Sequence, residues 1–421
     1  MGRIHIDHVE PGMVVASDLI HSNGRFLLGK GMVLDPTHLR VLKIWGIHSV
    51  EVEGSSDEPG PLPEARIDPV TFQAAEEVTR RRFSKGDLNH PFLRELFRIC
   101  TLRKARRIAQ SPGKDDPLDR AESTDRANAK RTAAPSIAKI NPDLLVDENT
   151  DLASLPTIFL EISQVIGDPR SSAVHVANVI SKDTSLSAKL LRMVNSAFYN
   201  FPYKIDTISR AVTIIGSRQL STLALGTSVV TSFQGIRKDL VDMESFWKHS
   251  IACGVGGRMI ASFKNIPNTE RLFVAGLLHD IGRLILYQRI PEPMSRIILK
   301  AKENQELLRS VEDEVLRFDH ADVGGMLFKK WKLPLAMEQA VAYHHNPLDS
   351  PYLLEASIIH LSDILANALE IGTSGERLIP PLLPEIWDTL GLETEMFEKA
   401  VPLIERQVEE IVYHFFDERQ P

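Results

Sequence analysis

Five histidines and two aspartates in the second half of the chain have the side chains that divalent metal ions bind. In order they are His249, His279, Asp280, His320, His344, His345 and Asp363. Imidazole and carboxylate groups suit Fe, Mn, Zn or Ni, and several of each can hold two ions close together. Such a cluster can polarise a phosphate group and activate water for its hydrolysis. The pattern therefore predicts a site for one or two divalent metal ions.

The spacing of these residues requires several elements to meet. Neighbouring residues of a helix point about 100° apart, so His279 and Asp280 need ligands from other helices to complete a site. His249 on an earlier helix and Asp363 on a later one supply them, and the other three histidines complete a second site. The alternative is that the histidines only pack and form hydrogen bonds, as a single histidine on an apolar helix usually does.

Helices are the elements that must position this cluster. From Glu148 onward, apolar residues recur at i, i+3, i+4 and i+7, which is typical of amphipathic helices. Aromatic residues make up only 6% of the chain, which favours an aliphatic, helical core over a β-sandwich. No alternation of strands and helices indicates a parallel sheet. The predicted fold is mainly α, with helices at 155–166, 185–198, 208–215, 220–233, 246–263, 271–287, 305–318, 353–368 and 396–416.

The chain before these helices has a different character. Short β-type runs alternate with turn residues, and Asn23-Gly24 between apolar runs is a strong hairpin signal. A short helix is predicted at His38–Trp45. Between residues 103 and 134 large apolar residues are rare, so this stretch cannot bury enough apolar surface to fold. The predicted organisation is a small β-rich module at 1–54, a linker plus helical hairpin at 55–110, a flexible charged linker at 111–147, an all-α domain at 148–370, and C-terminal helices packing on that domain at 371–421.

The composition excludes several classes of protein. Of the 421 residues, 43% are hydrophobic and 25% charged, as in soluble globular proteins. The 49 Lys+Arg and 56 Asp+Glu give a net charge of −7, which argues against a nucleic-acid-binding protein. Cys100 and Cys253 do not form a disulfide framework, and neither a signal peptide nor a membrane-spanning apolar run is present. We therefore expect a cytoplasmic protein that makes no contact with a membrane.

The motifs around the metal-type residues resemble those of the HD superfamily of metal-dependent phosphohydrolases. The resemblance rests on Phe246-Trp-Lys-His249, Gly276-Leu-Leu-His279-Asp280-Ile-Gly, Phe318-Asp-His320-Ala-Asp-Val-Gly, Tyr343-His344-His345 and His360-Leu-Ser-Asp363. Upstream, Ile180–Tyr199 and Ile205–Gly216, with Leu155-Pro156 before them, resemble the HDOD domain. The resemblance covers roughly residues 151–368, and it makes 148–370 an HDOD domain with an HD-like half at about 240–370.

The resemblance implies a role in bacterial signal transduction, because HDOD domains are regarded as signalling output modules related to HD phosphohydrolases. The first 54 residues resemble, less specifically, a module that precedes HD-GYP cyclic-di-GMP phosphodiesterases, through Leu27–Leu34 and Leu42–Ile47. In an enzyme of this superfamily, Asp280 would be catalytic as a metal ligand, and Arg283 would stabilise the charge of a phosphate group.

Two functions follow as alternatives. The first is a regulatory module that contacts other signalling proteins or binds a nucleotide-type ligand. The second is an active metal-dependent phosphohydrolase or cyclic-nucleotide phosphodiesterase. Asn346-Pro-Leu-Asp-Ser stands where HD-GYP proteins have Glu and Gly-Tyr-Pro, Arg283 replaces their lysine, and Ser245 replaces a metal-bridging glutamate. These departures favour the regulatory function, and the sequence leaves the oligomeric state open.

Overall fold

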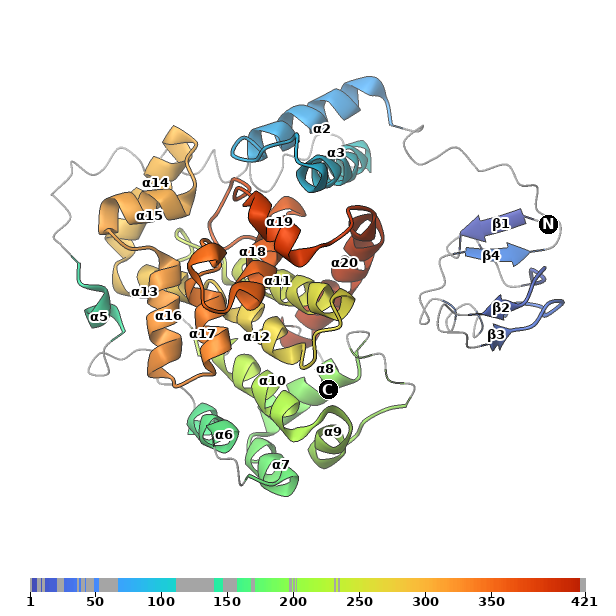
Figure 1. Cartoon of the computed structure of the whole chain (residues 1–421), viewed down its shortest axis with the longest axis horizontal. Helices are drawn as coiled ribbons and strands as arrows, with labels where there is room; N and C mark the ends of the chain where they lie inside the picture. Colours follow the sequence, from blue (N-terminus) through green and yellow to red (C-terminus); the bar gives the residue numbers. More distant parts are fainter. Residues whose placement is uncertain are drawn as a thin grey trace. The chain divides into compact units, whose positions relative to one another are not determined.

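The computed structural model places two compact units, Met1–Ile67 (unit 1) and Asp68–Pro421 (unit 2). Figure 1 shows the elements of each unit in sequence colours. The structure describes residues 2–5, 9, 12–20, 26–35, 38, 42, 49–52, 67–110, 140–146, 157–167, 171–196, 199, 201, 203–230, 232–233 and 235–416.

Unit 1 contains short antiparallel strand pairs around a small apolar core. β1 (Gly2–His5) pairs with β4 (Ser49–Val52), with Gly2 opposite Val52, and β2 (Leu19–Ile20) pairs with β3 (Phe26–Leu28). Val15 forms a bridge to Val52 and packs with Leu34 and Val50. The predicted Asn23-Gly24 turn, the linker after residue 53 and all of the predicted helix at 38–45 except residues 38 and 42 lie outside the described residues.

Unit 2 begins with a helical hairpin. α2 (Pro69–Arg82) starts at Asp68, whose carboxylate accepts a hydrogen bond from the Thr71 N–H, and it packs against α3 (Pro91–Gln110). Phe92, Leu93 and other apolar residues of α3 join the main core. The predicted charged linker at 111–147 lies outside the described residues up to residue 139. Its last part contains the short helix α5 (Pro142–Leu145), which the prediction of a flexible linker did not include.

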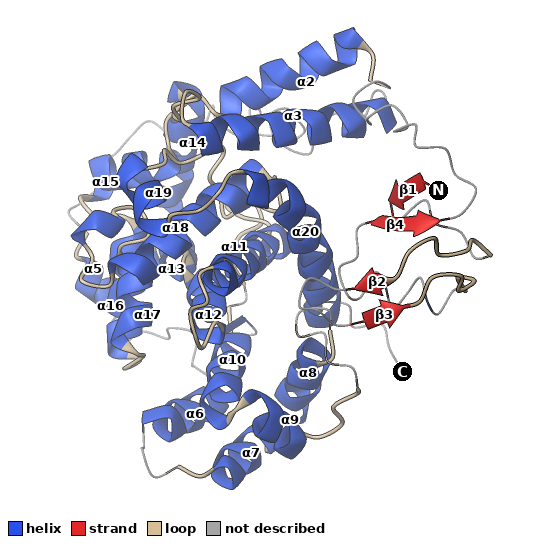
Figure 2. Ribbon diagram, turned by 45° about the vertical axis from the view of Figure 1, so that its right-hand side comes forward, coloured by secondary structure: helices blue, strands red, loops and turns tan. Residues whose placement is uncertain are grey.

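Five helices form one end of unit 2, opposite the hairpin (Figure 2). They are α6 (Thr157–Gly167), α7 (Ala173–Ser181), α8 (Thr184–Val194), α9 (Ile208–Ile215) and α10 (Ser217–Val230). The prediction that a helix continues to residue 198 is wrong, because α8 ends at Asn195. The side-chain amide of Asn195 donates to the carbonyl oxygens of Leu191 and Ile205 and accepts from the Ile205 N–H. These bonds stabilise a turn at Asn195 in place of another helical turn.

The long helix α11 (Met243–Phe263) runs through the middle of unit 2 and contacts α12 (Glu270–Leu278), α18 (Leu353–Ala368) and α20 (Glu395–Phe416). Its residues are buried on nearly every side, from Phe246 to Ala261. The other helices of this part are α13 (Ile281–Arg289), α14 (Pro291–Asn304), α15 (Leu308–Leu316), α16 (His320–Lys330), α17 (Leu335–Ala342), the 3-10 turn η4 (Pro347–Asp349) and α19 (Pro384–Leu390).

The predicted mainly α fold is confirmed by this succession of helices and by the near absence of sheet in the described residues. The predicted helices 208–215 and 353–368 coincide with α9 and α18. None of the helices in the described ranges combines the length and the apolar character that crossing a bilayer needs.

Candidate metal centre

A break between α12 and α13 brings His279 and Asp280 to the same point. The prediction of one helix at 271–287 is wrong here, because α12 ends at Leu278 and α13 begins only at Ile281. His279 keeps helical dihedral angles (φ −58°, ψ −36°), and the chain departs from the helix at Asp280 (φ −95°, ψ 11°). Gly282 then allows α13 to touch α16, since a Cβ at this position would lie 2.0 Å from the carbonyl oxygen of His320.

Four further elements supply the other predicted metal-type residues. His249 lies in the first third of α11, His320 is the first residue of α16, His344 and His345 follow α17, and Asp363 lies in α18. The structure brings all seven residues together. Six of them are at most 5% exposed, and only the seventh, His345, is half-buried.

His249, His279, Asp280 and Asp363 form what we call the first group. Nε2 of His249 lies 3.2 Å from Asp363 Oδ1 and 3.7 Å from Asp280 Oδ2. Nε2 of His279 lies 3.4 Å from each of the same two oxygens. Two imidazole nitrogens and two carboxylate oxygens thus converge, which is a ligand set that Zn, Mn or Fe accepts.

His320, His344 and His345 form the second group, on the other side of Asp280. Asp280 Oδ1 lies 2.9 Å from Nε2 of His320 and 4.0 Å from Nε2 of His344. Nε2 of His345 lies 3.0 Å from Nε2 of His320. Potential ligand atoms of these three histidines all lie within 4.8 Å of one another. The two oxygens of Asp280 therefore face one group each.

Hydrogen bonds fix which nitrogen faces the centre. Nδ1 of His279 donates to the Gly276 carbonyl (2.7 Å), and Nδ1 of His344 donates to the Val341 carbonyl (2.7 Å). Because a carbonyl only accepts, each Nε2 is left with a lone pair. The Nε2 atoms of His249, His279 and His344 are buried and have no hydrogen-bond partner. Such atoms normally find partners, so these residues fit a divalent metal ion.

The electrostatics of the cluster favour the metal-binding forms of some of its ligands and the protonated forms of others. Burial raises the pKa of Asp363, but the nearby imidazoles of His249 and His279 outweigh it and hold this pKa far below its usual value. Burial lowers the pKa values of His344 and His345, and neighbouring histidines lower them further. Metal ligands must be ionised carboxylates and neutral imidazoles, and Asp363, His344 and His345 are held in those states. Burial lowers the pKa of His279, but Asp280 and Cys253 outweigh it and raise this pKa well above its usual value, so an ion would have to displace a proton from this ring. Burial and Arg283 lower the pKa of His320, but Glu312 and Asp280 outweigh them and raise it to about 9.

Glu312, in α15, belongs to the site and was not predicted. Its Oε2 accepts from Nδ1 of His320 at 2.5 Å, and its Oε1 lies 3.3 Å from Nε of Arg283. Burial raises the pKa of Glu312, but His320 and Arg283 outweigh it and lower the pKa to about 2. The sequence did carry a signal, because Glu312 stands at helical spacing between the buried Leu308 and Leu316. A carboxylate on the buried face of a helix requires a partner.

Arg283 is buried in the cluster at 2% exposure. Its Nη1 donates to the Ser374 hydroxyl (2.6 Å) and lies 3.4 Å from Asp280 Oδ2. Its Nη2 lies 3.0 Å from Nδ1 and 3.2 Å from Nε2 of His320. The predicted contact between Arg283 and a phosphate group stays a prediction. In the structure the guanidinium contacts protein groups on several sides.

Residues 371–378, which we call the strap, cross the site between α18 and α19. The Thr373 N–H donates to the carbonyl oxygen and hydroxyl of Ser245. Ser374 contacts Arg283, and its carbonyl oxygen accepts from the Tyr287 hydroxyl (2.9 Å). Glu376 accepts from the Leu308 N–H (2.8 Å). The strap therefore ties α11, α13 and α15 together around the cluster.

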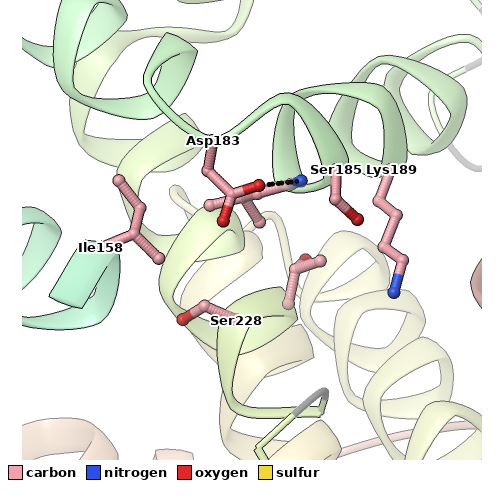
Figure 3. A pocket seen from close by; sticks show the side chains of 7 residues that line it. Ile158, Asp183, Ser185, Lys189 and Ser228 are labelled. Carbon is pink, nitrogen blue, oxygen red and sulfur yellow. Dashed lines mark hydrogen bonds between the residues drawn. The ribbon is translucent and has the colours of Figure 1, made fainter. Parts of the chain in front are cut away.

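A separate pocket lies between α6, α8 and α10 (Figure 3). Asp183 lines this pocket, and its carboxylate accepts a hydrogen bond from the Leu186 N–H (2.9 Å). The prediction that Asp183 caps the helix that follows it, α8, is therefore confirmed. The pocket, of about 40 Å³, is also lined by Ile158, Ser185, Lys189, Thr227 and Ser228. It is much smaller than the several hundred Å³ of a typical small-molecule site.

The fold and the cluster define an α-helical protein with a buried His/Asp centre of the metal-binding type. Residues 152–347 match the HDOD domain family, so the chain contains an HDOD domain, as the motifs predicted. Asp363 and the strap lie beyond the matched residues. An uncharacterized protein of Treponema pallidum (strain Nichols) is 26% identical over 250 residues, which cover 57% of this chain. That match spans 47% of the relative, about half its length.

Solved structures share the fold. A candidate phosphohydrolase of Shewanella amazonensis has a TM-score of 0.54 and 24% identity, covering 65% of this chain and 97% of its own. An HDOD domain protein of unknown function from Geobacter sulfurreducens has a TM-score of 0.51 and 20% identity, covering 72% of this chain and 99% of its own. A candidate signal transduction protein of Marinobacter aquaeolei has the same TM-score and identity, with 75% and 72% covered.

Proposed function

We propose that unit 2 is a regulatory signalling module whose HDOD domain binds a divalent metal ion in its interior. The buried Nε2 atoms of His249, His279 and His344, which lack hydrogen-bond partners beside two ionised carboxylates, carry this proposal. A bound ion would satisfy these nitrogens and offset the carboxylate charge. The module would then act on other signalling proteins or on a nucleotide-type ligand through its surface.

Burial of the ligands favours a regulatory role over catalysis. Six of the seven metal-type residues are at most 5% exposed, and the strap is bonded to Ser245 and Arg283 beside them. A nucleotide needs a cleft of several hundred Å³ to reach such a centre. The ion would instead join helices from distant parts of the chain and favour one arrangement of them.

The second candidate is a metal-dependent phosphohydrolase or cyclic-nucleotide phosphodiesterase. The completeness of the cluster supports it, because two groups of ligand atoms share Asp280. His345, the least buried of the seven residues, would lie on the side from which a substrate approaches. A bound divalent ion supplies Lewis-acid chemistry at a phosphate group. The chain would contribute the neutral imidazoles that orient the site, and the strap would have to move to admit a substrate.

Metal content tests the proposal directly. Elemental mass spectrometry of the untagged protein, loaded with Mn²⁺ and desalted, should find about one equivalent in the wild type and less than about a tenth of that in Asp280→Ala. Asp183→Ala removes a carboxylate that only caps α8, and it should keep the wild-type content. An empty wild-type protein would refute the proposal and leave the histidines as packing residues.

A hydrolysis assay separates the two candidates. The metal-loaded protein is incubated with bis(p-nitrophenyl) phosphate and with a cyclic dinucleotide, and we expect no turnover above that of Asp280→Ala. Metal-dependent turnover that Asp280→Ala abolishes, while its circular dichroism stays helical, would establish the enzyme and reject a purely regulatory role.

A further inference from the structure

The guanidinium group of Arg283 lies against the second group of histidines. Its Nη2 is 3.2 Å from Nε2 of His320, the atom that would have to ligate an ion in this group. Its Nη1 is 3.4 Å from Asp280 Oδ2, on the carboxylate that joins the two groups. A permanent positive charge thus already occupies the surroundings in which a second ion would bind.

Arg283 is held in this position from several sides. Glu312 Oε1 lies 3.3 Å from its Nε, and the Ser374 hydroxyl accepts from its Nη1 at 2.6 Å. With 2% exposure, the side chain has almost no contact with solvent into which a second ion could displace it. Releasing the guanidinium would also leave the fully buried Glu312 without its cationic partner, which is costly.

The charges of the site balance with a single divalent ion. Asp280, Asp363 and Glu312 carry three negative charges, and Arg283 carries one positive charge. With neutral histidines the net charge is −3 + 1 = −2, which one divalent ion cancels. A second divalent ion would leave a net charge of +2 in the interior, where uncompensated charge is strongly disfavoured. The sum covers only these four groups; the Glu376 carboxylate lies outside it, bound by the backbone N–H groups of residues 308, 377 and 378.

Both ring nitrogens of His320 are already engaged by protein groups. Its Nδ1 faces Glu312 Oε2 at 2.5 Å, and its Nε2 faces Asp280 Oδ1 at 2.9 Å. The ring is thus already held between two carboxylates, and turning it toward an ion would break both contacts. The second group therefore lacks its central ligand as long as Glu312 and Asp280 hold this ring.

We infer that the Arg283–Glu312 pair takes the place of a second cation, so that the site binds one divalent ion, at the first group. This inference rests on the proposed function, because it presupposes a metal ion at His249, His279, Asp280 and Asp363. His344 can reach the same ion, since ligand atoms of His279, His344 and Asp363 lie within 4.8 Å of one another. Arg283 is then a positioning residue that sets the metal stoichiometry. Its role differs from the predicted contact with a phosphate group.

Titration with Mn²⁺ tests the stoichiometry. Isothermal titration calorimetry and elemental analysis of the full chain should give one ion for the wild type. Arg283→Met removes the charge at similar volume and should bind two ions, while Arg283→Lys, which keeps the charge, should bind one. Arg271→Met serves as the matched control, since Arg271 pairs with Glu355 at 3.0 Å away from the site, and it should also bind one ion.

Electron paramagnetic resonance of the Mn²⁺-loaded wild type keeps the test decisive even where Arg283→Met fails to fold. One isolated ion gives an uncoupled six-line spectrum, and two neighbouring ions give a coupled spectrum. Two ions in the wild type, or one ion in a folded Arg283→Met variant, would overturn the inference and leave the metal site in place. No ion in the wild type would instead refute the proposed function on which the inference rests.

Discussion

At the scale of single residues, helix ends set the orientation of the site's imidazoles. His279 and His344 each follow a helix, α12 and α17, and each donates to a carbonyl three residues earlier, at Gly276 and Val341. The last carbonyls of a helix have no partner within it, so they are available to accept these bonds. The same bond that completes the helix end thus leaves Nε2 free to ligate.

His360 supports this arrangement from the next helix, and we expect His360→Phe to weaken metal binding. Its Nδ1 donates to the His344 carbonyl at 2.8 Å, and phenylalanine keeps the volume but removes the donor. Loss of a hydrogen bond that supports a metal ligand costs about tenfold in metal affinity and about 1 kcal/mol of stability. Calorimetric Mn²⁺ titration measures the first effect, and urea unfolding of the metal-free protein measures the second.

The same substitution at an exposed histidine provides the control. His175→Phe, in α7, should leave both the Mn²⁺ affinity and the urea midpoint at their wild-type values. If His360→Phe binds Mn²⁺ as tightly as the wild type does, the bond to His344 has no part in orienting the ligand.

The sequence identified the metal-type residues but not the groups that hold them. His279-Asp280 and His344-His345 are recognisable because their motifs are local in the chain. Glu312 and Ser374 act on Arg283 from positions 29 and 91 residues away, and only the packing of α15 and the strap reveals them. Glu312 could have been suspected from its place on a buried helix face, whereas Ser374 stands in an ordinary loop sequence.

At the scale of elements, the strap depends on a glycine. Gly372 has a φ of +70°, and a Cβ there would lie 2.2 Å from the Ser245 carbonyl oxygen and 2.7 Å from the backbone nitrogen of His249. We therefore expect Gly372→Ala to cost about 1 kcal/mol for the backbone conformation and a further 1–3 kcal/mol, roughly, for the collision with α11. It should also lower the Mn²⁺ content, because the collision displaces the helix that presents His249.

Gly235→Ala separates these two costs. Gly235 has a φ of +75°, but nothing lies within 4 Å of a Cβ built there. Urea unfolding should therefore show only the smaller loss for Gly235→Ala, with unchanged metal content. Equal losses in the two variants would mean that the strap is not seated against α11 as the structure shows.

Helix boundaries show where element prediction from sequence stops. Amphipathic spacing places α9 and α18 at their observed bounds, because apolar periodicity is a property of each segment alone. It misses the break at His279 and the end of α8 at Asn195. Asn195 ends its helix through hydrogen bonds to Ile205, ten residues later. A pattern of apolar residues every 3.6 positions carries no information about such a contact.

At the scale of the whole of unit 2, the α2–α3 hairpin is attached where the site's last helix ends. Arg82 donates to the Asn367 carbonyl, and the Asn367 side chain donates to Asp363 Oδ1 at 2.8 Å. Glu370 lies just beyond α18 and pairs with three cations of the hairpin, Arg82 at 2.8 Å, Lys104 at 3.2 Å and Arg107 at 2.7 Å. Through Asn367, the hairpin thus supports Asp363, a predicted metal ligand nearly 300 positions further along the chain.

This attachment should make unit 2 sensitive to acid. Burial raises the pKa of Glu370, but Arg82, Lys104 and Arg107 outweigh it and lower the pKa to about 2, from 4.5 in the unfolded chain. A carboxylate whose pKa is lower in the folded state contributes stability that is complete above its unfolded pKa. That stability is lost as the pH falls from 4.5 towards 2. The difference corresponds to about 3 kcal/mol.

Glu370→Gln should therefore lose up to about 3 kcal/mol at pH 7, and its stability should fall less steeply than that of the wild type between pH 4.5 and pH 2. Urea unfolding at a series of pH values measures both effects. Glu244→Gln breaks an exposed pair with Lys248 and should cost less than about 1 kcal/mol. Parallel pH profiles for Glu370→Gln and the wild type would show that the three cations do not hold this carboxylate in the folded protein.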